Sequence, residues 1–240
     1  MIFDLHIHTN RNSADSNLSP LELIQEAKRI GLHGVVVTEH DRCWDRWSAR
    51  ELAAEHDFLF LRGMEVSTDL GHILVYGLEE YVSGIIRAEK LRQVVDEAGG
   101  AMVAAHPFRR IFTRDFRHGQ EAAPRSLDEA ARRTLFKLTD GIEVCNGGSI
   151  DRENKLAMEV CDYLGQAATG GSDAHSDLGI GCFATQFDDP IETEADVIAA
   201  LKARRCRAVM LQKQADRTSY TVSETSERFQ RLEGWRVWAG

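Results

Sequence analysis

The chain has 240 residues, enough for one large domain with a complete hydrophobic core, and α/β barrels commonly have this length. Its net charge of −9 argues against broad affinity for nucleic acid or acidic membrane surfaces, and every apolar run is shorter than the roughly 18 residues of a membrane span. The five cysteines lack CxxC spacing, and the N-terminus lacks a basic, strongly apolar leader. We therefore expect a cytoplasmic protein with free thiols.

Short apolar runs typical of β-strands alternate with amphipathic stretches typical of helices, and this order favours parallel strands joined by crossover helices. Strands are expected over residues 2–8, 34–40, 59–66, 73–78, 101–106, 141–145, 167–170 and 208–211. Helices are expected over residues 20–30, 89–98, 127–138, 152–164 and 194–204. The predicted fold class is therefore α/β, with one barrel domain over residues 1–212.

The start of the first helix is the clearest local signal. Ser19 can serve as its N-cap, Pro20 occupies the first helical position, and Glu22 completes a capping box. Residues 108–125 resemble a long loop, a kind that is usually functional or mobile inside a compact domain. Residues 213–240 are expected to form a C-terminal arm or helix docked on the barrel.

Histidines and acidic residues gather at the ends of the predicted strands. His6 and His8 are two residues apart at the end of the first strand, so their side chains point to the same face. The carboxyl ends of parallel barrel strands converge on one mouth, where active sites are built. The residues expected to meet there are His6, His8, Asp15, His40, Glu65, His72, His106, Asp173 and His175.

This mixture of side chains is typical of a metal centre. Neutral imidazole binds Zn, Fe and Mn, and a carboxylate can bridge two such ions. Paired ions lower the pKa of bound water and hold a phosphoryl oxygen during displacement. We expect two or three divalent ions (Zn, Mn or Fe), which would let an acidic protein bind an anionic substrate locally.

Several motifs together resemble one known family. The runs DLHIHT, the Asp15 segment leading to LSPLEL, VVVTEHD, GMEVS, AHPF and GSDAH follow the order of the PHP (polymerase and histidinol phosphatase) family over roughly residues 1–208. The run GSDAHSDLGIGCFATQF also resembles the C-terminal segment of its stand-alone hydrolases. The resemblance implies a distorted (β/α)7 TIM-like barrel, a two- or three-metal centre at the carboxyl ends of the strands, and phosphoesterase activity.

The resemblance also implies how the ions are shared. One ion is expected to bind the set His6, His8, Glu65 and Asp173. Glu65 should bridge to a second ion held by His106 and by His72, which is either a ligand or a donor beside the ligands. A third ion is expected on Asp15, His40 and His175. The family usually reads TDH and SDG where this chain has Thr38-Glu39-His40 and Asp15-Ser16, and the second change can alter the loop that carries Asp15.

Other polar residues near these motifs have less certain roles. Arg109 can bind a substrate phosphate as a bidentate fork, or it can be a solvated loop charge. Cys145 is expected to be a buried thiol rather than a thiolate ligand, and Glu143 and Asn146 can orient ligands. A second group of histidines is expected on the surface, namely His33, His56 and His118.

The main functional hypothesis is hydrolysis of a small phosphate monoester, either a nucleotide phosphate or a compound resembling histidinol phosphate, by metal-activated hydroxide. Asp173 and His72 are the expected catalytic residues, His72 as a proton donor to the leaving alkoxide. The sequence leaves the oligomeric state open. An amidohydrolase acting on C–N bonds is the enzymatic alternative, although no strand-end lysine is present. A non-catalytic, metal-stabilised domain that binds a phosphorylated ligand is the other alternative.

Overall fold

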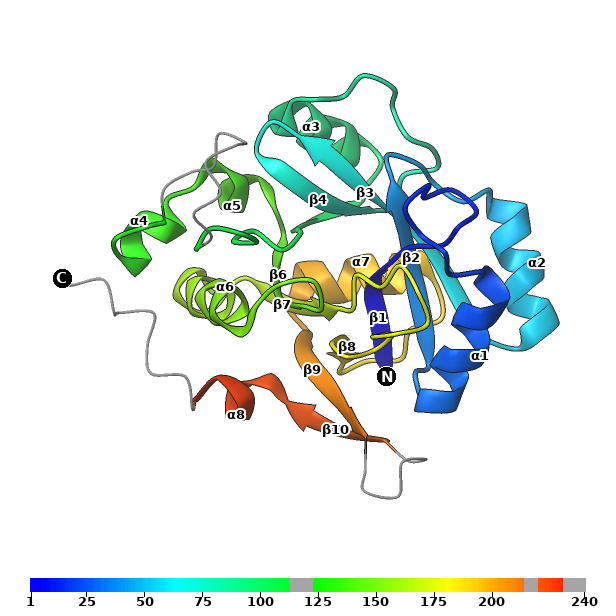
Figure 1. Ribbon diagram of the computed structural model, residues 1–240. Coiled ribbons are helices and arrows are strands. Elements are labelled where there is room, and N and C mark those ends of the chain that lie inside the picture. Colours follow the sequence, from blue (N-terminus) through cyan, green and yellow to red (C-terminus); the bar gives the residue numbers. More distant parts are fainter. Residues whose placement is uncertain (113–122, 214–219, 231–240) are drawn as a thin grey trace.

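The computed structural model describes residues 1–112, 123–213 and 220–230. Within these residues one curled sheet has the strand order β10-β9-β8-β1-β2-β3-β4-β5-β6-β7 (Figure 1). The strands are β1 (Ile2–Ile7), β2 (Gly34–His40), β3 (Leu59–Thr68), β4 (Gly71–Tyr76), β5 (Ala101–Ala104), β6 (Gly141–Asn146), β7 (Ala167–Gly171), β8 (Ala184–Phe187), β9 (Cys206–Lys213) and β10 (Tyr220–Glu224). The α/β class is confirmed.

Helices pack against both faces of this curled sheet. They are α1 (Pro20–Ile30), α2 (Arg46–His56), α3 (Ala88–Glu97), α4 (Leu127–Ala131), α5 (Thr134–Leu138), α6 (Asp151–Leu164), α7 (Glu194–Ala203) and α8 (Thr225–Gln230). In the view of Figure 1, α1 and α2 lie to the right of the sheet, and α4, α5 and α6 lie to its left. The apolar face of α1, including Leu23 and Ile24, packs against Val35 and Val37 of β2.

A full (β/α)7 barrel is not confirmed, because β4 is antiparallel to both of its neighbours, β3 and β5. The expectation of parallel strands is wrong at this point. Thr68 pairs with Gly71, so the chain reverses through a tight turn in which Gly71 has a φ of 108°. A parallel connection needs a crossover of about a dozen residues or more, and this segment has too few.

The last strand of the parallel part returns to the first. Asp173, just after β7, donates its backbone N–H to His6 O at 2.7 Å, and Ile7 forms an isolated parallel bridge with Ala174. The buried Asp4 carboxylate accepts backbone N–H bonds from His6, Ser172 and Gly181, which ties β1 to this segment. Burial raises the pKa of Asp4 to about 6 against the opposing effect of these bonds. The curl of the sheet therefore brings the ends of β1 and β7 together.

Local details of the sequence analysis have mixed outcomes. The capping box of Ser19 and Glu22 is confirmed, and Gly31 ends α1 with a φ of 87°. The helix expected over residues 127–138 is instead two short helices, α4 and α5, and α2, β8 and β10 were not predicted.

Part of the expected C-terminal arm lies on the sheet. β10 pairs antiparallel with β9, and Phe229 of α8 is buried. The domain boundary near residue 212 stays a prediction, and residues 113–122 of the expected loop and 231–240 of the arm lie outside the described residues. Among the residues that are described, no helix combines the length and apolar character needed to cross a membrane.

The tight packing of β1, β2 and β3 gives a stability prediction for Gly34→Ala. Gly34 is in register with Phe3 and Leu59, and a Cβ there would lie 2.3 Å from Phe3 Cε1. Overpacking of this kind costs about 1–3 kcal/mol. We expect urea denaturation to show a free energy of unfolding lowered by that amount.

Gly31→Ala is the control, because its added Cβ would meet no atom within 4 Å. That variant should show only the cost of a left-handed backbone for alanine, about 1 kcal/mol. A Gly34→Ala protein as stable as the wild type would contradict the described packing.

Candidate metal centre

The centre of the site is the carboxylate of Glu65, near the end of β3. Its side chain is only 1% exposed, yet both oxygens face imidazole nitrogens. The nitrogens near Oε2 belong to His6 (3.2 Å), His8 (3.3 Å) and His40 (3.0 Å), and those near Oε1 belong to His72 (2.7 Å) and His106 (2.9 Å). One carboxylate therefore joins five histidines, which come from β1, β2, β4 and the segments that follow β1 and β5.

The most buried cluster of potential ligands consists of His6, His8, Glu65 and Asp173. The Nε2 atoms of His6 and His8 lie 3.2–3.4 Å from Glu65 Oε2 and from Asp173 Oδ1. When four nitrogen and oxygen ligands surround a zinc ion as a tetrahedron at the usual bond lengths, neighbouring ligand atoms are about 3.3–3.4 Å apart. These separations fit a single ion with tetrahedral coordination.

Unsatisfied polar atoms support this fit. Three atoms of the cluster are buried without a hydrogen-bond partner in the described part of the chain, namely His6 Nε2, His8 Nε2 and Glu65 Oε2. A buried polar atom without a partner normally costs about 1–3 kcal/mol. A cation at this point would satisfy all three at once.

Two further clusters adjoin the first. Glu65, His72 and His106 have ligand atoms close enough to hold an ion, and so do His8, His40 and His175. Asp15, which is 59% exposed, places Oδ2 3.2 Å from His40 Nε2 and 3.3 Å from His175 Nε2.

The structure thus brings together all nine residues expected from the sequence. It differs from the expected partition at the third set, where His8 joins His40 and His175 and Asp15 lies beside the cluster rather than in it.

Glu143 of β6 fixes the orientation of His6. Its Oε1 lies 2.9 Å from His6 Nδ1, while its Oε2 accepts hydrogen bonds from the backbone N–H of His106 (2.8 Å) and from Asn146 Nδ2 (3.0 Å). A carboxylate that accepts a hydrogen bond from the Nδ1–H group leaves the Nε2 lone pair of His6 free for a metal. Glu143 and Asn146 therefore lie where the sequence analysis expected groups that orient ligands.

The backbone is strained at two of the clustered residues. His106 has a φ of 28° and Asp173 a φ of 53°, both in the left-handed region. Such conformations cost on the order of 1–3 kcal/mol each and persist where the surroundings enforce them. Here the N–H of His106 bonds to Glu143, and the N–H of Asp173 bonds to His6 O.

Comparison with known proteins identifies the family. A model of the PHP domain matches residues 4–152, and a PHP-associated model matches residues 151–206. The chain belongs to the PHP family. A stretch of 114 residues is 27% identical to an uncharacterized protein from Methanocaldococcus jannaschii and covers 44% of this chain and 67% of that protein.

Two solved structures share this PHP fold. A two-domain protein from Bacteroides vulgatus, which contains a predicted PHP-like metal-dependent phosphoesterase, gives a TM-score of 0.62 at 21% identity, covering 87% of this chain. This chain spans only 64% of that protein. An amidohydrolase from Chromobacterium violaceum, solved with bound sulfate and no metal, gives 0.57 at 19% identity and covers 84% of this chain and 96% of its own. At these identities the likeness shows the fold.

Electrostatics of the PHP site favour positive charge. Burial acts to lower the pKa of His6, but the carboxylates of Glu143, Asp173 and Glu65 outweigh it and hold that pKa well above its usual range. Burial acts to raise the pKa of Asp173, but His6, His8 and Arg109 hold it far below its usual range. Ionised carboxylates therefore surround His6 and favour its positively charged, doubly protonated form when no metal ion is bound.

Arg109 lies at the edge of this centre. Its guanidinium donates hydrogen bonds to Asp173 Oδ2 and Asn146 Oδ1, and its side chain is 27% exposed. Next to it is an open cleft of about 420 Å³, lined by His72, His106, Arg109, Arg110, Leu70 and Leu135 among others. A basic and partly apolar cleft beside a potential metal centre can bind an anionic ligand with an organic part.

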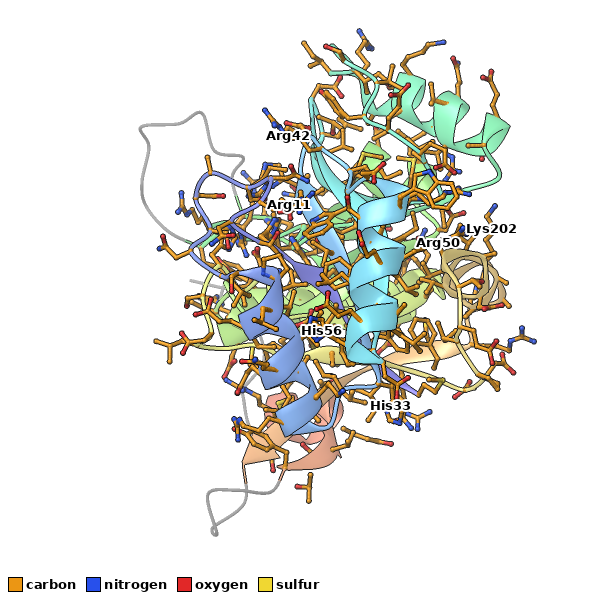
Figure 2. All side chains as sticks on the ribbon, turned by 90° about the vertical axis from the view of Figure 1, so that its right-hand side faces the viewer. Arg11, His33, Arg42, Arg50, His56 and Lys202 are labelled. Carbon is orange, nitrogen blue, oxygen red and sulfur yellow. The ribbon has the colours of Figure 1, made fainter. Side chains whose placement is uncertain are left out.

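Several residues considered in the sequence lie outside the clusters. His33 and His56 lie on the face covered by α1 and α2, toward the end opposite Arg11 and Arg42 (Figure 2). Cys145 is fully buried, and burial raises the pKa of its thiol, as expected for an inert side chain. His118 lies outside the described residues.

Glu143→Gln tests the support of His6. The amide cannot accept both the imidazole proton and the backbone N–H of His106, so the His6 ring should lose its orientation. Loss of such a partner typically weakens metal affinity about 10–100-fold, and we expect this loss in competition titrations with a zinc-binding dye.

Glu194→Gln is the matched control, because Glu194 pairs with Arg62 and belongs to none of the three clusters. Equal zinc affinity in the wild type and Glu143→Gln would contradict the orienting role.

The raised pKa of His6 gives a pH prediction. Below that raised pKa, a metal ion must displace the His6 proton, whereas the ionised Glu65 and Asp173 release none. Metal affinity should therefore fall as the pH is lowered. Calorimetry at pH 7 should give a binding enthalpy that varies with the ionisation enthalpy of the buffer, and an enthalpy independent of the buffer would overturn the assignment.

Proposed function

We propose that this PHP-family chain is a metal-dependent phosphoesterase that hydrolyses a small phosphate monoester, either a nucleotide phosphate or a compound resembling histidinol phosphate. The observation that carries the proposal is the set of three ligand clusters around Glu65, next to a cleft that contains Arg109. Three clusters favour three divalent ions. The Bacteroides vulgatus protein with the similar fold contains a predicted metal-dependent phosphoesterase, which agrees with this reaction class.

The ligands are assigned by cluster. His6, His8, Glu65 and Asp173 would hold one ion, Glu65 with His72 and His106 a second, and Asp15, His40 and His175 a third, with His8 beside it. Bound Zn, Mn or Fe ions would lower the pKa of water and neutralise phosphoryl charge. The mixture of neutral imidazole and carboxylate donors suits these metals.

The other residues bind the substrate and transfer protons. Arg109 is assigned to a phosphoryl oxygen, since its guanidinium can form two parallel hydrogen bonds to a phosphate. His72 is 41% exposed and lines the cleft. In the alternative in which it does not bind the second ion, His72 would donate a proton to the leaving alkoxide. Leu70 and Leu135 would contact the organic part of the substrate.

The cellular setting is proposed on chemical grounds. All five cysteines are free thiols, which supports a reducing cytosolic environment. A small phosphorylated substrate, rather than nucleic acid, fits the net charge of −9 and the size of the cleft.

An amidohydrolase reaction is the second candidate, because the similar protein from Chromobacterium violaceum is described as an amidohydrolase. The sulfate bound in that structure is a tetrahedral oxyanion, which agrees equally with a phosphate-binding site. The strands β1 to β7 of the present chain contain no lysine.

A metal-reconstituted hydrolase assay would separate the candidates. We expect turnover of phosphate monoesters with Mn²⁺ or Zn²⁺, loss of that turnover on chelation, and no turnover of cyclic amides or N-acyl compounds. Asp173→Ala should lower kcat by about 10³-fold or more, because an ion ligand contributes several kcal/mol to the transition state.

Asp177→Ala, an exposed carboxylate four residues further on, is the control and should leave kcat unchanged. Full activity in Asp173→Ala, or hydrolysis of amides alone, would contradict the proposal. A wild-type protein that binds metal and phosphate without turnover would favour a binding domain.

A further inference from the structure

Glu39 is a fully buried carboxylate that belongs to none of the three ligand clusters. It precedes His40 on β2 and accepts four hydrogen bonds. Its Oε2 accepts from Thr9 N (3.1 Å) and Ser13 Oγ (2.5 Å), and its Oε1 accepts from Thr9 Oγ1 and Trp44 Nε1 (2.8 Å). A buried charge is tolerated only when its hydrogen-bonding capacity is filled in this way.

The donors on Glu39 come from the segment that carries two potential ligands. Thr9 follows His8 directly, and Ser13 lies two residues before Asp15. Among the described residues, the ionic partners of Asp15 are His40 and His175, and Asp15 is exposed. The position of Asp15 therefore depends on how its loop is anchored, at Ser13 to Glu39 and at Ser16 to the carbonyls of His8 and His175.

Ser13 extends the influence of Glu39 to the imidazole of His8. Because its hydroxyl donates its one proton to Glu39, Ser13 Oγ can only accept from its other neighbours, which are the backbone N–H of His40 (3.3 Å) and His8 Nδ1 (3.4 Å). His8 therefore carries its proton on Nδ1. The Nε2 atom, which faces Glu65 and Asp173, is left with a free lone pair.

We propose that Glu39 is a positioning residue for the metal centre: it anchors the loop that presents Asp15 to His40 and His175, and through Ser13 it sets the tautomer in which His8 can bind a metal. The inference rests on the metal binding of the proposed function but not on its substrate or reaction. Glu39 replaces the aspartate usual in the family motif, and its longer side chain reaches Thr9, Ser13 and Trp44 together.

Glu39→Gln tests this role at nearly constant shape. In either orientation, the NH₂ group of the new amide faces two of the groups that donated to Glu39. One of these two groups is an N–H group, either the Thr9 backbone or the Trp44 ring, and it cannot accept a hydrogen bond. The loop should loosen while the apolar surroundings stay in place.

The experiment measures zinc binding by the full chain after chelation, with stoichiometry from elemental analysis and affinities from dye competition. We expect the weakest of the wild-type sites to lose about 10–100-fold in affinity in Glu39→Gln, as for other partners of metal ligands, while the tightest site changes less. Ser13→Ala should shift the same site in the same direction by a smaller factor, and it decides the question if Glu39→Gln does not fold. Glu194→Gln, which loses an ion pair with the buried Arg62, is the control for a general loss of stability.

Unchanged zinc affinities in both Glu39→Gln and Ser13→Ala would overturn the positioning role while leaving the proposed function intact. Equal weakening of all sites in Glu39→Gln, with none in Ser13→Ala, would assign Glu39 a purely structural role and also overturn it. A wild-type chain that binds no zinc, manganese or iron would instead overturn the proposed function.

Discussion

The structure depends on one buried carboxylate, Glu65, placed among five imidazoles. Two oxygens cannot satisfy that many ring nitrogens, and several of these polar atoms are buried without a partner in the described part of the chain. Polar groups in such a state are costly in a protein interior. Divalent cations held by these residues would resolve the problem, because a cation accepts lone pairs from imidazole nitrogens and from carboxylate oxygens. The same requirement explains the supporting groups, since Glu143 and Ser13 lie within hydrogen-bond reach of the Nδ1 atoms of His6 and His8, and accepting from Nδ1 would leave each Nε2 lone pair free.

The two departures from a regular barrel, at β4 and at the approach of β7 to β1, both bring clustered residues together. Because β4 is antiparallel, its first residues rather than its last lie at the mouth, and Ser67 of β3 pairs with His72. A histidine near the start of β4 can therefore lie beside Glu65, which is three residues before the end of β3. At the other end of the sheet, β7 approaches β1 so closely that a Cβ on Gly171 would lie 2.4 Å from His6 Cβ. This contact brings Asp173 and His175 to His6 and His8.

The sequence predicted the site better than the connections between its strands. The histidines and carboxylates at predicted strand ends were sufficient to predict which side chains lie together, because the carboxyl ends of parallel strands share one mouth. The reversal of the chain between β3 and β4 was not predicted, although too few residues join these strands for a crossover. α2 lacks an apolar stripe, since Ala49 is its buried residue, and its start is marked only by the cap of Asp45 on Ser48. The break between α4 and α5 has no glycine or proline to announce it. The role of Glu39 could not be predicted, because it depends on hydrogen bonds between segments that only the folded chain brings together.

Anomalous diffraction from crystals of the metal-loaded protein tests the central claim most directly. Data collected on both sides of the absorption edge of the bound metal locate each ion independently of any assumption about its ligands. The account predicts a peak enclosed by His6, His8, Glu65 and Asp173, with any further peaks on the His72–His106 side and the His40–His175 side of Glu65. Fully loaded crystals with no anomalous peak in contact with Glu65 would contradict it.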